Sequence, residues 1–366
     1  MCVTRGRGKS LSQRQPYRLA KHQCVVHKWG MTVLVTGAAG FVGFHTAKRL
    51  LADGEIVIGV DNFNSYYDPA LKESRWALLE SSRAFDGIRL DIADRDGIDA
   101  MFRSKQPKKV IHLAAQAGVR HSLDHPHDYA DANLVGMLNI LEGCRTVKTE
   151  HLVFASSSSV YGANGTMPFS EHDGTAHPVS LYAATKRANE AMAHAYAHLY
   201  QFPATGLRFF TVYGPWGRPD MASFKFTKAI LAGDRIPVFN QGNMARDFTY
   251  VDDVVEGIVR ALAHPPAPDS EWDARQADPA TSGVAPYRLF NIGRGAPVKL
   301  LDFIAVLEGA LGQKAKIDFQ PMQPGDVEQT YCDVSELDRA VGYRPSVTIE
   351  DGISAFVSWY REFYKV

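Results

Sequence analysis

The sequence predicts an α/β protein with a doubly wound parallel sheet and a smaller C-terminal α/β domain. Its 366 residues, 45% of them hydrophobic, are enough for one large or two modest globular domains. Between Thr32 and Phe210, short β-branched runs alternate with longer segments of helical periodicity. Such runs indicate strands that are covered on both faces. The first run leads directly into a glycine-rich turn, as the first strand of such sheets often does.

The expected strands of this sheet span residues 32–36, 56–61, 88–91, 110–113, 152–155 and 207–210. The regular alternation ends after Phe210, where residues 214–219 form a loop by composition. Residues 265–286 are rich in Pro, Ala, Asp and Ser without a period, so we expect a mobile surface loop there. The first domain should therefore span 31–211, with 247–292 returning to pack on it. Residues 212–246 and 293–366 should form the second domain.

The first 30 residues are a basic leader with seven Lys or Arg and no acid, although the whole chain balances 40 Lys plus Arg against 40 Asp plus Glu. The neutral balance argues against a nucleic-acid surface or an acidic partner. We expect the leader to be disordered or not native, because Met31 opens directly onto the first strand. The alternatives are a transit peptide or a nucleic-acid-binding tail.

Cysteine usage and hydropathy indicate the compartment. Cys2 and Cys24 lie in the leader, while Cys144 and Cys332 are far apart and lack metal-ligand spacing. There is no apolar run of 18 residues to span a membrane. We therefore expect a cytoplasmic protein without a metal.

The glycine-rich turn and the second strand predict a dinucleotide site of the Rossmann type. Gly37 permits a tight turn, Gly40 lets backbone N–H groups approach a pyrophosphate, and Gly43 lets the following helix pack on the strand. The second strand ends at Asp61, whose carboxylate can accept both ribose hydroxyls and would repel a 2′-phosphate. This pattern favours NAD over NADP.

A tyrosine and a lysine predict acid–base chemistry. Tyr182 and Lys186 are four residues apart and share one helical face. Upstream, the strand 152–155 runs into Ser156 to Ser159, which places hydroxyls at the carboxyl edge of the sheet. A nearby ammonium and a positively charged nicotinamide would both lower the pKa of the phenol towards neutrality. Tyr182 could then remove a proton from a sugar hydroxyl while hydride leaves the carbon.

At this point the chain resembles the nucleotide-sugar branch of the extended short-chain dehydrogenase/reductases. The motifs that carry the resemblance are GAAGFVG, HLAAQAGVRHS, SSSSVYG, YAATK, GLRFFTVYGP and RDFTYVDDVV. The resemblance implies a catalytic trio of Ser157, Tyr182 and Lys186. The expected cofactor-binding residues are Gly37, Gly40, Phe41, Val42, Gly43, Asp61, Asn62, Asp91, Ile92, Leu113, Ala114, Ala115, Asn133, Tyr182, Lys186 and Phe209. Arg246 would hold a substrate phosphate, and Gln323 and Asp326 would hold the uridine ribose.

Within that branch, the residues after Ser157 favour epimerisation. Dehydratases need an acid pair there and UDP-xylose-forming decarboxylases carry a Glu, whereas this chain has Ser158 and Ser159. The wider sequence, including PVSLYAATK and RFFTVYGPWGRPDMA, is similar to UDP-glucuronate 4-epimerases, which form UDP-galacturonate. Arg218 and Thr211 would then contact the C6 carboxylate together with Ser158, and Ser159 would be a further substrate-binding residue. Alternatively, Arg218 pairs only with Asp220 or solvent.

Two other functions stay open from the sequence. One is a 4-epimerase for neutral sugars such as UDP-glucose and UDP-galactose. The other is a catalytically silent NAD-binding regulator, which the presence of both Tyr182 and Lys186 disfavours. The resemblance also implies a homodimer formed by the helices around 131–147 and 180–200, and no nucleic-acid or membrane partner.

Overall fold

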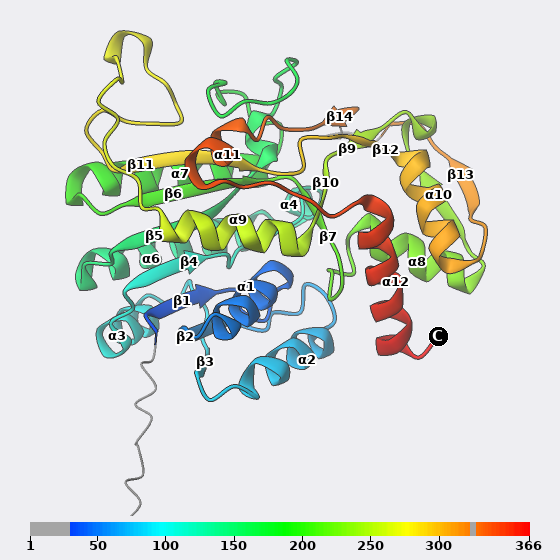
Figure 1. Ribbon diagram of the computed structural model, residues 1–366, viewed down its shortest axis with the longest axis horizontal. Coiled ribbons are helices and arrows are strands. Elements are labelled where there is room, and N and C mark those ends of the chain that lie inside the picture. Colours follow the sequence, from blue (N-terminus) through cyan, green and yellow to red (C-terminus); the bar gives the residue numbers. More distant parts are fainter. Residues whose placement is uncertain (1–29, 323–326) are drawn as a thin grey trace, which may run out of the picture.

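The computed structural model describes residues 30–322 and 327–366, so the expectations about the leader up to residue 29 lie outside the described residues. A seven-stranded parallel sheet forms the centre, in the order β11-β6-β5-β4-β1-β2-β3 (Figure 1). Its strands are β1 (Thr32–Thr36), β2 (Ile56–Asp61), β3 (Phe85–Arg89), β4 (Lys109–His112), β5 (His151–Ser157), β6 (Ala204–Phe209) and β11 (Tyr287–Ile292). The prediction of a doubly wound sheet is confirmed.

The strand order reverses direction at β1, which creates a crevice at the carboxyl ends of β1 and β4. β1 and β2 have the expected bounds. The third strand was expected at 88–91 but spans Phe85–Arg89. It pairs only with β2 at the sheet edge and is partly exposed, so its sequence lacks the continuous apolar run of a central strand.

Helices cover both faces of this sheet (Figure 1). One hydrophobic cluster joins the sheet to residues of α1, α2, α9 and α11, and a second joins the opposite face to α3, α6 and α7. These helices are α1 (Phe41–Ala52), α2 (Pro69–Glu80), α3 (Arg95–Lys105), α6 (Gly136–Val147), α7 (Leu181–Tyr200), α9 (Val251–Ala263) and α11 (Ser335–Val341). Two short helices, α4 (His121–Asp124) and α5 (Pro126–Tyr129), precede α6.

A third hydrophobic cluster lies beside the sheet, where α8 (Ala222–Ala232), α10 (Leu300–Leu311) and α12 (Ile349–Tyr364) pack together. Short strands complete this part and join it to the sheet. They are β7 (Thr211–Tyr213) with β10 (Phe248–Tyr250), β8 (Arg235–Val238) with β13 (Lys316–Phe319), and β9 (Ala245–Arg246) between β12 (Val298–Lys299) and β14 (Gln329–Thr330). The domain boundaries given above stay a prediction.

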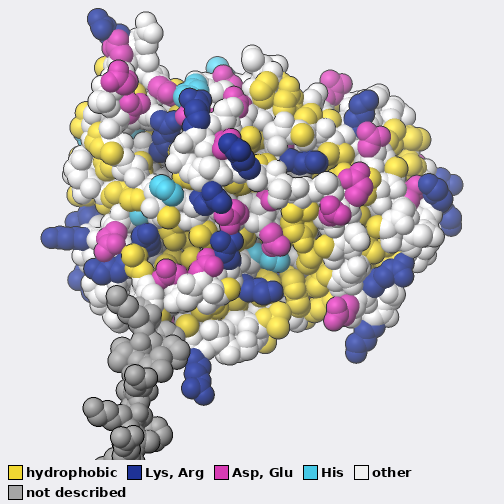
Figure 2. Space-filling model, in the orientation of Figure 1, with side chains coloured by type: hydrophobic (Ala, Val, Ile, Leu, Met, Phe, Trp, Pro, Cys, Tyr) yellow, Lys and Arg dark blue, Asp and Glu magenta, His cyan; other side chains and the backbone are white. Residues whose placement is uncertain are grey.

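The segment 265–286 is largely a loop, with one short turn at Ala274–Gln276. Its second half lies only partly on the surface, because Ala280 and Ala285 are fully buried against the sheet while Val284 is 56% exposed. On the face shown in Figure 2, Lys and Arg side chains are interspersed with Asp and Glu. No helix in the described part of the chain is both long and apolar enough to cross a bilayer.

Candidate active site

A cleft of about 640 Å³ lies at the carboxyl edge of the sheet. It brings together most of the site residues that the sequence predicted: Gly37, Gly40, Phe41, Val42, Gly43, Asp61, Asn62, Ile92, Leu113, Ala114, Ala115, Ser157, Ser158, Ser159, Tyr182, Lys186, Phe209, Thr211, Arg218 and Arg246. Gln323 and Asp326 lie outside the described residues. Segments that are far apart in the sequence therefore meet in one hollow.

The glycine loop has the geometry of a phosphate cradle. Gly37 has a φ of +73°, and a Cβ on Gly43 would lie 2.0 Å from the Gly37 carbonyl oxygen. Gly40 precedes α1, and no side chain caps that helix. The first N–H groups of α1 thus remain available to an anion.

Asp61 closes the loop from the end of β2. Its Oδ2 accepts the N–H of Ala39 at 3.1 Å and its Oδ1 accepts the N–H of Phe63 at 2.9 Å. The carboxylate is 8% exposed and lines the cleft. It stands where an adenosine ribose would bind, and its charge would repel a 2′-phosphate.

Two predicted cofactor residues stand back from the cleft wall. Asp91 accepts the N–H of Ala93 at 2.8 Å and the side-chain N–H of Asn62 at 2.8 Å. Asn133 was expected to line the groove, but it is buried behind Gln116, whose N–H it accepts at 2.8 Å. Both side chains are occupied by holding neighbouring backbone in place, so they support the wall rather than form it.

The catalytic trio converges from β5 and α7. Ser157 ends β5, and Tyr182 lies in the first turn of α7, which Ser180 caps by accepting the N–H of Ala183 at 3.1 Å. Lys186 follows one turn later, is 3% exposed, and donates from Nζ to the Ala155 carbonyl at 2.9 Å. Helix α7 therefore fixes the phenol and the ammonium on one wall.

The Ser157 hydroxyl lies in the same cleft wall as Tyr182. Its Oγ accepts from the Ser159 Oγ at 2.9 Å and from the Ser159 N–H at 3.2 Å. A hydroxyl has a single proton to donate, so Ser157 can still donate to the phenol oxygen of Tyr182, and this interaction lowers the pKa of the phenol.

The electrostatics of Tyr182 differ from the expectation. Burial raises its pKa, although the hydrogen bond with Ser157 and the charge of Arg218 act in the opposite direction. Burial also lowers the pKa of Lys186, to about 8. The expected fall of the phenol pKa towards neutrality is therefore not a property of the protein chain alone, because desolvation disfavours both charged forms.

Helix α7 also bears a closed ion pair one turn beyond Lys186. Arg208 on β6 donates from Nε and Nη2 to the two carboxylate oxygens of Glu190 at 2.8 and 3.0 Å. Both side chains are 0% exposed. The Ser156 hydroxyl donates to Glu190 Oε1 at 2.6 Å, which links this pair to the strand that carries Ser157.

A second Arg–carboxylate pair lies in the cleft, in the loop between β7 and α8. Arg218 donates from Nε and Nη2 to the two oxygens of Asp220 at 3.0 and 2.8 Å. The side chains are 24% and 23% exposed. The Tyr66 hydroxyl donates to Asp220 Oδ2 at 3.2 Å. The alternative that Arg218 pairs with Asp220 is thus realised, yet Arg218 still lines the cleft.

Two side chains, of which Arg75 is fully buried, anchor this loop to the dinucleotide part. Arg75, 0% exposed, donates to the carbonyl of Ala39 at 2.8 Å and to that of Trp216 at 2.5 Å. His45 Nε2 lies 2.9 Å from the Pro215 carbonyl. Burial lowers the pKa of His45 to about 4, so the neutral ring donates from Nε2. The guanidinium of Arg75 therefore donates hydrogen bonds both to the glycine loop and to the loop that carries Arg218.

A smaller and more apolar hollow of about 380 Å³ continues from the cleft towards α8. Arg246 lines both hollows and donates to the carbonyls of Val327 and Glu328 at 2.7 and 3.0 Å. Arg120 also lines both and lies over the Phe239 ring at 5.0 Å. Two cations thus flank the junction of the hollows.

Some cleft residues were not identified from the sequence as site residues. Among them are Gln116, Arg120, His121 and Lys225, besides Tyr66 and Lys72. The first three directly follow or closely follow the strand β4, and position after a parallel strand is the signal that could have found them. Lys225 faces the cleft from α8, and its sequence neighbourhood carries no comparable signal.

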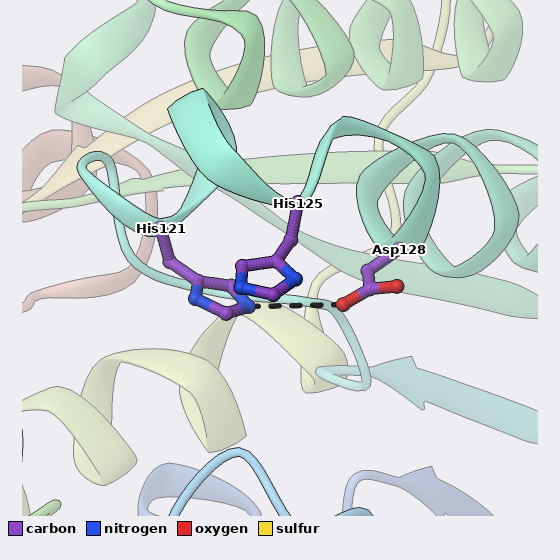
Figure 3. Close-up of side chains that lie close together, drawn as sticks. All are labelled: His121, His125 and Asp128. Atoms are coloured by element: carbon purple, nitrogen blue, oxygen red, sulfur yellow. Dashed lines mark ion pairs between the residues drawn. The ribbon is translucent and has the colours of Figure 1, made fainter.

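His121, His125 and Asp128 point toward one another near the cleft (Figure 3), with their ligand atoms within 4.8 Å. His121 Nε2 lies 3.7 Å from Asp128 Oδ2. However, the two imidazole rings are stacked at 4.2 Å and only 17° from parallel. A metal lies near the plane of each imidazole that binds it, so one ion cannot bind both rings as they stand. The group is a contact between His121 and Asp128 combined with a stack of the two imidazole rings, rather than a formed metal site.

Comparison with known proteins adds to this geometry. A model of the NAD dependent epimerase/dehydratase family matches residues 33–273. A probable UDP-glucuronate 4-epimerase of Rhizobium meliloti (strain 1021) is 48% identical over 92% of this chain and 98% of the relative. The crystal structure of the UDP-glucuronic acid 4-epimerase from Bacillus cereus, in complex with UDP-glucuronic acid and NAD, has a TM-score of 0.80 at 33% identity, covering 91% of this chain and 100% of that one. The UDP-glucose 4-epimerase of Thermotoga maritima, with UDP-glucose, has a TM-score of 0.79 at 29% identity, with coverages of 91% and 100%.

Proposed function

The chain belongs to the NAD dependent epimerase/dehydratase family, and we propose that it converts UDP-glucuronate to UDP-galacturonate by epimerisation at C4, using NAD. The observation that carries the proposal is that Ser157, Tyr182 and Arg218 line one cleft with the glycine loop. An acid–base group and a cation suited to a carboxylate thus lie beside a dinucleotide cradle.

The residues present fit NAD. The left-handed Gly37, the close approach at Gly43 and the uncapped start of α1 leave room and N–H donors for a pyrophosphate. Asp61 would accept the ribose hydroxyls, with Ile92, Leu113 and the neighbouring alanines along the groove. When bound, NAD supplies a hydride acceptor at C4 of the sugar and returns the hydride later.

Tyr182 does the proton chemistry. Its phenolate takes the proton of the C4 hydroxyl while Ser157 donates its single proton to the phenolate oxygen, and the buried charge of Lys186 favours the phenolate. The 4-keto sugar then rotates in the cleft. Tyr182 returns the proton to O4 after the hydride reaches the opposite face, which inverts C4.

The uronate poses a chemical hazard that the cleft must control. The 4-keto intermediate is a β-keto acid, in which the C5–C6 bond can break with loss of carbon dioxide while its electrons enter the C4 carbonyl π system. Ser158, Thr211 and Arg218 hold the carboxylate so that this bond does not align with the carbonyl, with Ser159 bracing Ser157 beside them. Arg246 at the substrate phosphate, and Gln323 and Asp326 at the uridine ribose, stay predictions.

The test is to incubate the purified protein with UDP-glucuronate, without added NAD, and to follow the products by proton NMR. Formation of UDP-galacturonate without net NADH is the expected result. Binding of NAD without any conversion would instead indicate the silent regulator. The variants Arg218→Lys and Thr211→Val should release UDP-4-keto-pentose or its reduced form; slower turnover without that by-product would contradict the carboxylate-holding role.

A neutral-sugar epimerase is the second candidate, since the Thermotoga maritima UDP-glucose 4-epimerase has almost the same TM-score, 0.79 against 0.80. The fold alone does not separate the two activities. Arg218 favours the uronate, because its guanidinium can form an ion pair with a C6 carboxylate but not with a neutral hydroxymethyl group. Equal turnover of UDP-glucose and UDP-glucuronate would favour the neutral-sugar activity.

We also propose a cytoplasmic homodimer. α7 and the segment that leads through α6 expose large apolar side chains, with Val135, Leu138 and Leu199 exposed by 43, 41 and 66%. Burial of such side chains against a second copy would stabilise a dimer. Free Cys144 and Cys332 suit a reducing compartment. Sedimentation of the protein and of a Leu138→Glu/Leu199→Glu variant tests the dimer: the variant should sediment as a monomer.

A further inference from the structure

The Arg218–Asp220 pair leaves part of the guanidinium free for a ligand. Asp220 engages the Nε and Nη2 edge of the fork, and the other N–H of Nη2 faces Met221 Sδ at 3.6 Å. The Nη1 group, with two of the five N–H donors of an arginine, is the part that Asp220 does not use. A second carboxylate can therefore bind Arg218 without displacing the first.

Asp220 is itself held in place and ionised. It accepts from Tyr66 as well as from Arg218. Burial acts to raise its pKa, but the charge of Arg218 and the hydrogen bonds from Arg218 and Tyr66 outweigh burial, so the pKa lies below its usual value. Tyr66 packs against the His121 ring at 4.8 Å and lines the same cleft. A bound uronate would thus meet a cation whose charge is largely offset by a fixed anion.

We propose that Asp220, oriented by Tyr66, is a positioning residue that sets the specificity of this cleft for a C6 carboxylate. The proposal rests on the proposed function. Asp220 keeps Arg218 in one orientation, so the substrate carboxylate binds only through the remaining N–H groups. It also repels that carboxylate, which keeps substrate and product from binding too tightly. Asp220 therefore weakens the binding of the uronate but fixes the direction of its carboxylate. Suppression of decarboxylation requires that fixed direction.

The test uses Asp220→Asn, which keeps the shape of the side chain but removes its charge. UDP-glucuronate should bind about fivefold more tightly, because a like charge is gone, while kcat falls about tenfold and the pentose by-product rises. The affinity for UDP-glucose should change by less than about twofold, because that sugar has no carboxylate for Asp220 to repel. Tyr66→Phe removes one hydroxyl and should shift the same quantities in the same direction, by less.

A matched control is Asp99→Asn, which breaks a similar pair with Arg103, at 2.8 Å on the exposed face of α3; it should leave all these quantities unchanged. A merely structural role of Asp220 would weaken UDP-glucose and UDP-glucuronate equally, and that outcome would overturn the proposal. If Asp220→Asn does not fold, Tyr66→Phe decides by the same ratio of affinities.

Failure of the proposed function is distinguishable from failure of this inference. A wild-type protein that epimerises only UDP-glucose refutes the proposed function, whereas the ratio of the two binding constants still tests Asp220. A wild-type protein that epimerises UDP-glucuronate, but whose affinity ratio and by-product are unchanged in both variants, refutes the inference alone.

Discussion

The two Arg–carboxylate pairs have the same chemistry but lie in different regions. Arg208 and Glu190 meet behind the catalytic helix with both side chains 0% exposed, whereas Arg218 and Asp220 meet in the cleft at 24% and 23% exposure. In both, the arginine uses its Nε and Nη2 edge. The difference is what surrounds the pair: Ser156, Arg187 and the Tyr161 ring contact the first, while the second lines the cleft that would receive a substrate.

This contrast separates two uses of one interaction. A fully enclosed pair cannot meet a ligand, so its effect is on the free energy of unfolding, and breaking it leaves an uncompensated buried charge. A pair at a cleft retains unused donors and can act on a substrate. Helix α7 joins the two regions, because Tyr182 and Lys186 face the cleft and Glu190 faces the enclosed pair.

The largest effect that separates the regions should come from Tyr182→Phe. Loss of the phenol should lower kcat about a thousandfold, while the thermal midpoint changes little because only one hydroxyl is removed. The measurement is conversion of UDP-glucuronate beside thermal unfolding. Tyr200→Phe, on the same helix and 46% exposed, is the control and should retain activity. A Tyr182→Phe protein with near-normal turnover would contradict the assignment of the base.

In the enclosed region, Glu190→Leu should lower the free energy of unfolding by about 3–5 kcal/mol. Arg208 would then be buried without its counter-charge. Urea denaturation measures the loss. The double variant Glu190→Leu/Arg208→Met should be less destabilised than the single variant, since the double change removes both charges. Equal or greater destabilisation in the double variant would contradict this account.

Two adjacent serines on β5 sharpen the comparison. Ser156 donates to Glu190, whereas Ser157 lies in the cleft beside Tyr182. Ser156→Ala should lower the free energy of unfolding by about 1.5–3 kcal/mol, the range for a hydrogen bond to a charged group. Ser157→Ala should mainly lower kcat. Parallel urea titrations and turnover assays of both variants check this, and the reverse assignment of effects would break the comparison.

A further effect, spread over a range of pH, concerns three histidines of the scaffold. Burial lowers the pKa of His45 and His151 to about 4 and that of His112 to about 3. As the pH falls below about 6.5, the unfolded chain binds protons that the folded chain does not. Each histidine should therefore reduce the free energy of unfolding by up to about 1.4 kcal/mol per pH unit between pH 6.5 and its folded pKa.

Urea titrations at pH 7 and pH 5 measure this slope. His151→Gln keeps hydrogen-bonding capacity towards Thr205 and Leu262, which the ring contacts at 2.9 and 3.1 Å, and should remove about a third of the histidine contribution. An unchanged slope in that variant would show that His151 is not responsible.

The parts of the fold that were predictable are those encoded by contiguous residues. β1, the glycine loop and β2 were placed correctly because a buried strand, a tight turn and an amphipathic helix follow one another within one stretch of chain. The edge strand β3 was misplaced because one of its sides has no neighbour, so Phe85–Arg89 alternates only weakly. The same reasoning predicted Tyr182, Lys186 and the hydroxyls of Ser156 to Ser159, which lie on one helix turn and at the end of one strand, whereas only the family resemblance singled out Ser157.

Long-range contacts were not predictable in this way. Tyr66 reaches Asp220 across 154 residues, and Arg75 reaches Trp216 across 141. Neither partner carries a local pattern, because a hydrogen bond between distant loops depends on how the whole sheet places them. The direction of the Tyr182 pKa shift was also not predictable, since burial of the phenol depends on residues from β5, α5 and the loop after β7.

The position of β11 has a consequence for how this protein is made. β11 spans Tyr287–Ile292 and pairs with β6, which ends at Phe209. During synthesis the outer edge of β6 thus stays unpaired while the intervening residues are added, a matter of several seconds at about 5–20 residues per second. An open edge of that kind is a site for wrong pairing between chains. A fragment cut at residue 273, where the family match ends, would keep that edge open permanently and should aggregate, so any shortened version of this chain must extend beyond Ile292.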